Sequence, residues 1–448
     1  MFKKWFVMLS IMSLLLAACS SGGKEAGQQP GAQKNIVIAT PVASPYLKEA
    51  VQKFEAIHPD IHVEIKEYFT AMKAKQDANG QVTQNISLLE VEKYTQSITT
   101  QILSGKASDL IATDFLPKDK FIKKQAFANV RELMDSDGSF QKSEYYLVDS
   151  GASNEGLYVV PTSFSLTGLV QGNKSLMEQA EIAVDDKTWT WDQVSDLSKQ
   201  LKEKAGQDTY AFLDIDPTYL MMGDLQRYYQ RDSASFDSDA FRNAMQQVKT
   251  LYDQKAMPIE FGADHSKGLF SFADMSNPTG ALVSILNPEM SIYRAPSFTG
   301  QTGEIGYEAG EAYAINNKSQ VKPEAWKFLS FMLSEEMQDS TELSGFPLNK
   351  AAAQKKIQQA REQIEKSGST GDASDSTPIS FPLPDAKAFD QAEETLKSVM
   401  ESAVSSSSAD LEITNIVMQE FAYYMNGQKT AEEVSQLIQN RVTTYLNE

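Results

Sequence analysis

The sequence is poor in the residues that most often carry chemistry, with one cysteine and three histidines among its 448 residues. A single cysteine excludes a disulfide bond within one chain. His58 and His62 stand four residues apart, but Pro59 separates them where a helix should give way to a strand, so they do not share one helical face. His265 has no ligand pattern around it. We therefore expect no metal site.

The usual sequence signals of catalysis and cofactor binding are also missing. The sequence contains no GxSxG, GxGxxG, P-loop or HExxH motif. Acidic pairs such as Asp185-Asp186 lie in polar stretches, where adjacent carboxylates usually form a solvated face. We expect no catalytic residues and no cofactor, although two carboxylates that meet across a cleft, as in a glycosidase, stay open at this point.

Positive charge is in deficit, because 60 acidic residues outnumber 41 lysines and arginines and give a net charge of −19. Such an excess opposes binding to nucleic acid or to an anionic membrane surface. The folded body is therefore not expected to have either as a partner.

Long apolar runs are absent except near the start, where residues 5–16 are almost continuously apolar and follow two lysines. The run is too short to span a bilayer comfortably, and with the small residues after it is typical of an export signal over residues 1–18. The sequence LAAC at residues 16–19 resembles a bacterial lipobox, whose cysteine, here Cys19, is diacylated and becomes the mature N-terminus. The alternative is a free or buried cysteine behind an ordinary signal.

The rest of the chain divides into a tether and a folded body. Residues 19–34 are rich in Ser, Gly, Gln and Pro, and we expect a flexible tether there. The remainder is long enough for two domains, with one low-complexity loop at residues 367–377.

Hydrophobic periodicity predicts an α/β organisation. Residues 36–38 and 61–65 have strand character, and Ser44-Pro45 between them marks the start of a helix, which predicts a parallel βαβ unit. Capping boxes at Thr190 and Thr430 predict two further helices, and residues 318–333 are amphipathic. Further strands are expected at residues 110–112, 157–160, 169–170, 281–285 and 312–315.

Several segments, in order along the chain, resemble a known family. Residues 105–111 (GKASDLI) resemble its G-x-x-P-D turn with Ser108 in place of proline, and residues 172–174 (GNK) resemble its Y-N-K motif with Gly172 in place of tyrosine. Further similar segments are residues 54–63, 156–161, 188–193, 293–298, 310–317 and 345–347. Together with the lipobox, they resemble the extracellular solute-binding proteins of family 1, which include maltodextrin receptors and lipoproteins of sugar ABC importers.

The resemblance implies a two-lobed periplasmic-binding-protein-like α/β fold, with mostly parallel sheets flanked by helices and a hinge between the lobes. Lobe one would hold residues 34–163 and 306–344, and lobe two residues 164–305 and 345–448. Hinge closure on a solute in the interlobe cleft requires no catalytic group. The implied protein is a monomer on the extracytoplasmic face of the cell membrane, held by its lipid anchor, that delivers a mono- or oligosaccharide to the membrane subunits of an ABC importer.

Saccharide sites combine polar groups for the hydroxyls with aromatic rings for the C–H faces. Asp114 is the strongest candidate, while Ser44 has helix capping and Phe164 has core packing as an alternative role. Glu289 stands where many relatives have tryptophan, which departs from the maltodextrin-binding pattern. The candidate ligand-binding residues are Thr40, Ser44, Thr113, Asp114, Phe115, Phe164, Ser165, Asp216, Tyr219, Asn287, Glu289, Tyr293, Tyr307, Glu308 and Phe346.

Three alternatives stay open at this point. A peptide or a cationic solute could replace the sugar with the same fold and the same closure. The protein could present its ligand to a sensor kinase instead of an importer. An anchored glycan-acting enzyme is the third alternative, and it would turn over added glycans.

Overall fold

The computed structural model describes residues 33–69, 75–76, 82–83, 88–149, 156–258, 264–300, 305–370, 381–405 and 409–447. The expected signal peptide, Cys19 and all but the last two residues of the expected tether lie outside these ranges. Residues 371–377 of the expected low-complexity loop also lie outside them, whereas residues 367–370 are the end of a helix.

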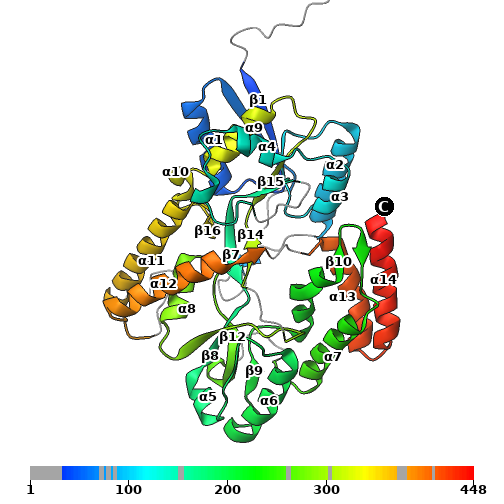
Figure 1. The fold of residues 1–448 in the computed structure, drawn as a ribbon, viewed down its shortest axis with the longest axis vertical. Coiled ribbons are helices and arrows are strands. Elements are labelled where there is room, and N and C mark those ends of the chain that lie inside the picture. The colour runs from blue at the N-terminus through cyan, green and yellow to red at the C-terminus, as the bar shows by residue number, and fades with distance from the viewer. Residues whose placement is uncertain are drawn as a thin grey trace, which may run out of the picture.

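The first of two bodies is built on a five-stranded sheet. Its strands are β1 (Lys34–Thr40), β2 (Ile61–Glu67), β5 (Leu110–Ala112), β6 (Val160–Pro161) and β15 (Ala312–Ile315), in the order β2-β1-β5-β15-β6 (Figure 1). β1 pairs in parallel with β2 and β5, and β15 runs antiparallel to β5 and β6. The expected parallel βαβ unit is confirmed, whereas only Val160 of the strand expected at residues 157–160 lies in β6.

Helices cover this sheet, and the first begins where the sequence indicates. The Ser44 side chain accepts a hydrogen bond from the Leu47 N–H at 3.0 Å, and Pro45 takes the first helical position. The helix buries Leu47 and Phe54 against the sheet and the neighbouring helices. The helices of this body are α1 (Pro45–Ile57), α2 (Leu88–Ser104), α3 (Lys118–Lys123), α4 (Val130–Ser136), α9 (Lys322–Met332) and α10 (Glu335–Gln338).

The second body has its own sheet and its own apolar core. The strands are β8 (Leu169–Asn173), β9 (Tyr210–Phe212), β12 (Gly268–Phe272) and β13 (Met290–Arg294), in the order β13-β8-β12-β9. Its helices are α5 (Lys174–Gln179), α6 (Trp191–Ala205), α7 (Asp239–Asp253), α13 (Leu411–Met425) and α14 (Ala431–Asn447). Both expected capping boxes are confirmed: Thr190 and Gln193 exchange hydrogen bonds at the start of α6, and Thr430 and Glu433 do so before α14.

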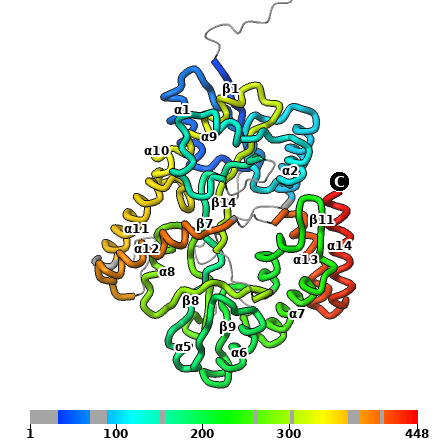
Figure 2. Tube along the Cα trace, in the orientation of Figure 1, coloured from blue at the N-terminus to red at the C-terminus, as the bar shows by residue number. Residues whose placement is uncertain are grey.

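A third sheet lies between the two bodies (Figures 1 and 2). Its strands are β7 (Ser163–Thr167), β14 (Gly306–Ala309), β16 (Phe346–Pro347) and β17 (Val404–Ser405), in the order β16-β7-β14-β17. Gly345 precedes β16 with φ of 91°, and a Cβ there would lie 2.8 Å from the Phe164 carbonyl oxygen, so glycine is required. The sheet thus contains residues at all three places where the chain is expected to pass between the lobes, near residues 163, 306 and 345, while the lobe boundaries themselves stay a prediction.

One expected strand is wrong, because residues 281–285 lie within the helix α8 (Pro278–Leu286). The Asn277 side chain accepts hydrogen bonds from the N–H groups of Thr279 and Gly280 at 3.0 and 3.1 Å, and Pro278 follows at the first helical position. A run that is apolar on every side carries no periodicity, so only this cap distinguishes helix from strand. α8 packs against α11 (Lys350–Thr370) and α12 (Ala386–Ser402).

The remaining elements are short. They are β3 (Lys75–Gln76), β4 (Val82–Thr83), η1 (Lys142–Glu144), η2 (Pro217–Tyr228), β10 (Tyr229–Gln230), β11 (Ser233–Ala234) and η3 (His265–Lys267).

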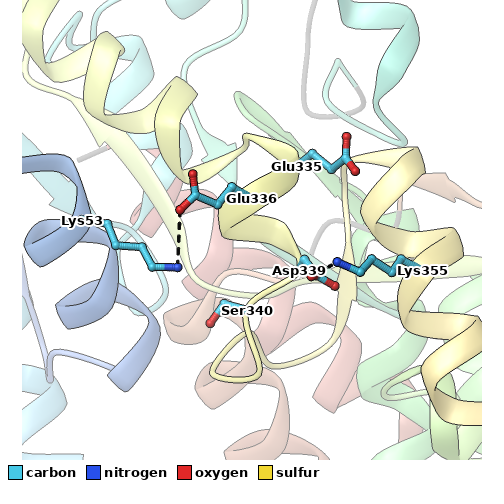
Figure 3. Close-up of a pocket in the computed structure, with 6 residues that line it drawn as sticks. All are labelled: Lys53, Glu335, Glu336, Asp339, Ser340 and Lys355. Atoms are coloured by element: carbon cyan, nitrogen blue, oxygen red, sulfur yellow. Dashed lines mark hydrogen bonds and ion pairs between the residues drawn. The ribbon is translucent and has the colours of Figure 1, made fainter. Parts of the chain in front are cut away.

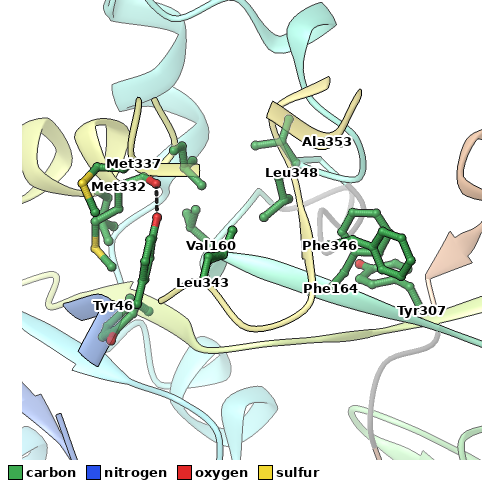
Figure 4. Packing of buried hydrophobic residues seen from close by; sticks show 14 of the residues in the cluster. Tyr46, Val160, Phe164, Tyr307, Met332, Met337, Leu343, Phe346, Leu348 and Ala353 are labelled. Carbon is green, nitrogen blue, oxygen red and sulfur yellow. Dashed lines mark hydrogen bonds between the residues drawn. The ribbon is translucent and has the colours of Figure 1, made fainter. Parts of the chain in front are cut away.

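The side chain of Gln338, the last residue of α10, is fully buried and binds segments that lie far apart in the sequence. Its amide nitrogen donates to the Thr162 carbonyl at 2.9 Å and to the Met332 carbonyl at 3.0 Å. Its amide oxygen accepts from the Leu348 N–H at 2.7 Å. Tyr46, from α1, contacts the same carbonyl of Met332 (Figure 4). The Gln338 amide therefore joins α9, the end of β6 and the residue after β16.

We expect Gln338→Leu to lower the free energy of unfolding by about 3 kcal/mol, because it leaves several buried backbone groups without partners. Urea-induced unfolding measures the change. The control is Gln354→Leu, which alters an exposed glutamine of α11. Equal effects of the two substitutions contradict the role given to the buried amide.

Gly172 on β8 explains why this chain departs from the Y-N-K motif. A Cβ at this position would lie 2.8 Å from the Phe270 ring, 2.9 Å from the Tyr293 ring and 3.1 Å from the Met177 sulfur. Phe270 and Tyr293 come from the strands on either side of β8. The two rings already occupy the space that a side chain at residue 172 would need.

We expect Gly172→Ala to destabilise the protein by about 1–3 kcal/mol, because it overpacks a closed core. Gly138→Ala is the matched control, since a Cβ there meets nothing within 4 Å. Thermal or urea unfolding compares the two variants. A Gly172→Ala protein as stable as the control contradicts the proposed packing.

Candidate functional site

Two neighbouring parallel strands of the first body end at the same edge of the sheet. β1 begins at the top of Figure 1 and runs toward the second body, so its carboxyl end and that of β5 face that body. Thr40 is the last residue of β1, and Thr113, Asp114 and Phe115 follow β5. The carboxyl edge of an open α/β sheet is where such folds place ligands. This edge is the candidate site.

The two threonines at this edge are buried and make local hydrogen bonds. The Thr113 hydroxyl donates to the Ala312 carbonyl at 3.1 Å, and the Thr40 hydroxyl donates to the Val42 carbonyl at 3.0 Å. These bonds fix the turns that follow β1 and β5. They hold the backbone that carries Asp114.

Asp114 is exposed, although the strand before it is buried. The surrounding protein limits the access of water to the carboxyl group and thereby raises its pKa from 3.8 to about 6. The negative charge of Glu311 adds to the rise. Hydrogen bonds from backbone groups of Asp114 and Ala312, and the charge of Lys118, act in the opposite direction. Asp114 is thus an accessible carboxyl in a recess of the protein, where its charge is disfavoured.

Glu311 lies at the candidate site and was not among the residues predicted from the sequence. The β5–β15 register pairs Ala112 with Tyr313, and its continuation by two residues places Glu311 opposite Asp114. The Glu311 carboxylate accepts a hydrogen bond from the Tyr313 hydroxyl at 3.0 Å. The Thr162 N–H and hydroxyl donate to the Glu311 carbonyl at 2.8 and 2.9 Å. Its place at the start of a predicted strand, within the family-like segment 310–317, was the available signal.

Aromatic rings lie beside the Asp114 turn. Phe115 is partly exposed, and its ring centroid lies 6.0 Å from that of Phe69, which the sequence analysis also missed. Tyr94 packs on Phe69 and donates its hydroxyl to the Ala112 carbonyl at 2.6 Å. The edge therefore combines two acidic residues with the partly exposed Phe115 ring, whereas Phe69 and Tyr94 are buried.

In the second body, Asp216 and Tyr219 lie in one helical segment. The Asp216 carboxylate caps η2 by accepting from the Thr218 N–H at 2.8 Å and from the Thr218 hydroxyl at 2.7 Å. The Tyr219 side chain is 54 % exposed, an unusual exposure for a large aromatic residue. Tyr219 is thus free to contact a ligand.

The candidates near β13 have mixed environments. Asn287 follows the last residue of α8, and its side chain accepts a hydrogen bond from the Glu289 N–H at 3.0 Å. The Glu289 side chain is exposed. Tyr293 packs on Phe270, and its hydroxyl lies 3.5 Å from the Met177 sulfur. Glu289 is thus accessible, while Tyr293 contributes to the core of the second body.

Three aromatic candidates form one buried cluster in the middle sheet (Figure 4). Phe164 stacks on Phe346 at 5.4 Å between ring centroids and meets the Tyr307 ring edge-on at 6.2 Å. All three are at most 4 % exposed, which favours a packing role. Ser165 and Glu308 face each other across β7 and β14, where Glu308 is exposed.

Ser44 caps the start of α1, which is the alternative role that the sequence suggested for it. Its part in ligand binding stays a prediction, as do those of the other candidates.

Two cavities lie away from the sheet edge of the candidate site. One, of about 540 Å³, is lined by charged residues of α1, α10 and α11, and ion pairs join Lys53 to Glu336 and Asp339 to Lys355 (Figure 3). The other, of about 630 Å³, is lined by residues of α4, α9 and the loop after α4, with Trp326 among them. Neither is lined by a predicted site residue.

The described residues contain no cluster of three or more potential metal ligands. His62 contacts Glu55 at 2.7 Å, and His265 lies 3.6 Å from Asp214. Within the described ranges, no helix is long and apolar enough to cross a membrane.

We expect the stability of the protein to fall relative to that of Asp114→Asn as the pH rises from 4 toward 7. The pKa of Asp114 is raised in the folded state, so the folded protein binds this proton more tightly than the unfolded chain does. The ionised Asp114 carboxylate therefore lowers the free energy of unfolding above pH 6, and this destabilisation is lost as the pH falls through 6 toward 4. Urea unfolding across this range measures it.

The matched control is Asp60→Asn, which removes an exposed carboxylate in the turn before β2. If wild type and Asp114→Asn show the same dependence on pH, the carboxyl at residue 114 is not in the environment described.

Comparison with known proteins identifies the family and the fold. Residues 39–339 match the family model of bacterial extracellular solute-binding proteins. A substrate-binding protein from Listeria monocytogenes, solved with cycloalternan, is 15% identical with a TM-score of 0.55, covering 93% of this chain and 99% of that one. The GacH receptor of Streptomyces glaucescens, solved unliganded and with acarbose, is 13% identical with a TM-score of 0.54, and the coverage is the same.

A third similar structure is an oligogalacturonide-binding protein from Yersinia enterocolitica, 15% identical with a TM-score of 0.57, covering 92% of this chain and 99% of that one. The expected two-lobed α/β fold is confirmed by these likenesses. The expectation of mostly parallel sheets is wrong for the described residues, where β8 runs antiparallel to β12 and β13, and β7 runs antiparallel to β14 and β16. The matching segment covers more than half of the chain and includes β5, the Asp114 turn and β15, so the chain belongs to the family of bacterial extracellular solute-binding proteins.

Proposed function

We propose that this protein captures a saccharide between its two bodies and delivers it to an ABC importer. The observation that carries the proposal is the edge formed by Asp114, Glu311 and the partly exposed Phe115 ring, in a chain of the solute-binding family. Carboxylates accept hydrogen bonds from sugar hydroxyls, and aromatic faces pack on sugar C–H groups. Three similar structures have names or ligands that refer to oligosaccharides or to acarbose.

The second body supplies the opposing surface in this proposal. Tyr219 is its accessible aromatic ring, and Glu289 is an accessible acid where relatives have tryptophan. Closure would bring these groups toward Asp114 by bending the segments near residues 163, 306 and 345. A ligand favours the closed state only through contacts that are better in that state.

We also propose that Cys19 is diacylated and holds the protein on the extracytoplasmic face of the cell membrane. The support is the LAAC sequence after a short apolar run. A tether of residues 19–34 would let the folded body reach the importer subunits as a monomer.

A second candidate ligand is a cationic solute. The paired carboxylates of Asp114 and Glu311 and the net charge of −19 favour it. The fold and the closure would be the same, so the ligand screen below includes both classes.

We expect an oligosaccharide such as maltotriose or a galacturonide oligomer to raise the melting temperature of the purified protein. A ligand at 100 times its Kd adds about 2.7 kcal/mol of stability. Differential scanning fluorimetry with sugars and with spermidine measures the response. Stabilisation by spermidine and by no sugar overturns the saccharide proposal in favour of the cationic one.

The site is tested with the sugar that gives the largest shift. Asp114→Asn and Tyr219→Ala should each weaken its binding about tenfold, the equivalent of about 1.4 kcal/mol. Tyr423→Ala is the matched control for Tyr219, because Tyr423 is 42 % exposed on α13. Calorimetry that finds unchanged affinity in both site variants contradicts the proposed location.

A further inference from the structure

The helix α3 and the β10–β11 hairpin belong to different apolar cores. Phe121 of α3 packs with Ile111 of β5 in a core of the first body. Tyr229 of β10, Ala234 of β11 and Tyr445 of α14 pack against the core of the second body. A contact between α3 and the hairpin therefore joins the two bodies.

Two ion pairs of opposite polarity make this contact. Asp119 and Lys123 stand four residues apart on α3, so they share one helical face. Arg231 and Asp232 form the two-residue turn of the hairpin, between the paired residues Gln230 and Ser233. Arg231 lies 3.7 Å from the Asp119 carboxylate, and Lys123 lies 2.5 Å from the Asp232 carboxylate. Each element presents one acid and one base to the other.

A third contact lies beside the ion pairs. The Lys120 ammonium, on α3, lies 3.5 Å from the centre of the Tyr445 ring, a cation–π geometry. The Tyr445 hydroxyl donates to the Asp410 carboxylate at 3.0 and 3.1 Å, which adds negative charge on the same side of Lys120. The Asp410 N–H donates to the Tyr229 hydroxyl at 2.8 Å. Asp410 thus connects α14 to the hairpin that faces α3.

The contact lies away from the middle sheet. In Figure 1, α3 and β10 are at the right, next to α14, while β7, β14 and β16 lie nearer the centre. Figure 2 shows β11 and α14 at the same side, below α2. The charged contact of α3 therefore joins the two bodies at a place separate from the paired strands of the middle sheet.

The charged contact is easily opened. Side-chain exposures of 48% for Lys123 and 66% for Asp232 leave both groups open to water and to salt. Exposed pairs of this kind each change an equilibrium by about two- to five-fold. Several acting together bias a two-state equilibrium without locking it.

We propose that α3 and the β10–β11 turn form an electrostatic latch that holds the two bodies together before any solute binds. This inference rests on the proposed closure of the two bodies. The latch adds to the closed state a stabilisation that does not depend on the ligand. It makes closure, and through closure the affinity for solute, weaken with rising ionic strength.

The test uses the ligand-free protein, so that it does not depend on the identity of the solute. Lys123→Glu places two carboxylates face to face, whereas Lys123→Glu with Asp232→Lys restores the pair with exchanged signs. Lys199→Glu is the matched control, because it makes the same charge change in an exposed pair with Asp196 inside α6. Small-angle X-ray scattering at low salt measures the radius of gyration.

We expect Lys123→Glu to raise the radius of gyration and to lower the closed-to-open ratio by about two- to five-fold. The double variant should return to the wild-type value, and 1 M NaCl should raise the radius of gyration of wild type more than that of Lys123→Glu, because salt also screens the repulsion between the two carboxylates of the variant. An unchanged radius in Lys123→Glu, or an increase equal to that of Lys199→Glu, overturns the latch. Arg231→Glu provides the same test from the hairpin side.

The outcome is separate from that of the ligand screen. If Lys123→Glu opens the protein but no solute stabilises it, the latch stands and the proposed function fails. If a sugar binds and the radius of gyration never responds to the variants or to salt, the function stands and the latch fails.

Discussion

The amide of Gln338 occupies a position where water cannot replace a lost partner, so every group around it must be in place at once. Its bond to the Thr162 carbonyl fixes the residue that in turn binds the Glu311 carbonyl through its own N–H and hydroxyl. Glu311 then lies opposite Asp114 by strand register. The acidic pair of the candidate site therefore depends on a buried amide in a different element.

Much of the fold follows from local signals that have a direct physical cause. Ser44 and Thr190 each supply an oxygen for an unpaired N–H at a helix start, so the first turns of α1 and α6 are readable from sequence. α8 was not readable by periodicity, because a helix buried between α11 and α12 needs apolar residues on all faces. The Asn277-Pro278 pair was the sequence signal for the start of this helix, but the apolar run after it also fits a buried strand.

Only part of the candidate site could be predicted from the sequence in this way. Asp114 follows a predicted strand, so its position at a sheet edge could be expected. Glu311 could not be paired with it, because the antiparallel partner of β5 is almost 200 residues later in the chain and only the register brings the two together. Phe164, Tyr307 and Phe346 could not be separated from exposed aromatic residues such as Tyr219, since burial is a property of the assembled sheet.

Gly172 has a consequence for how this sequence can diverge. The Phe270 and Tyr293 rings fill the space that a side chain at residue 172 would occupy, so the three positions share one volume in the core. A descendant that regained the tyrosine of the family motif would have to reduce both rings in the same lineage, and reduction of a ring first would leave a cavity. Relatives should therefore show these positions changing together, with a small residue at 172 accompanying large ones at 270 and 293.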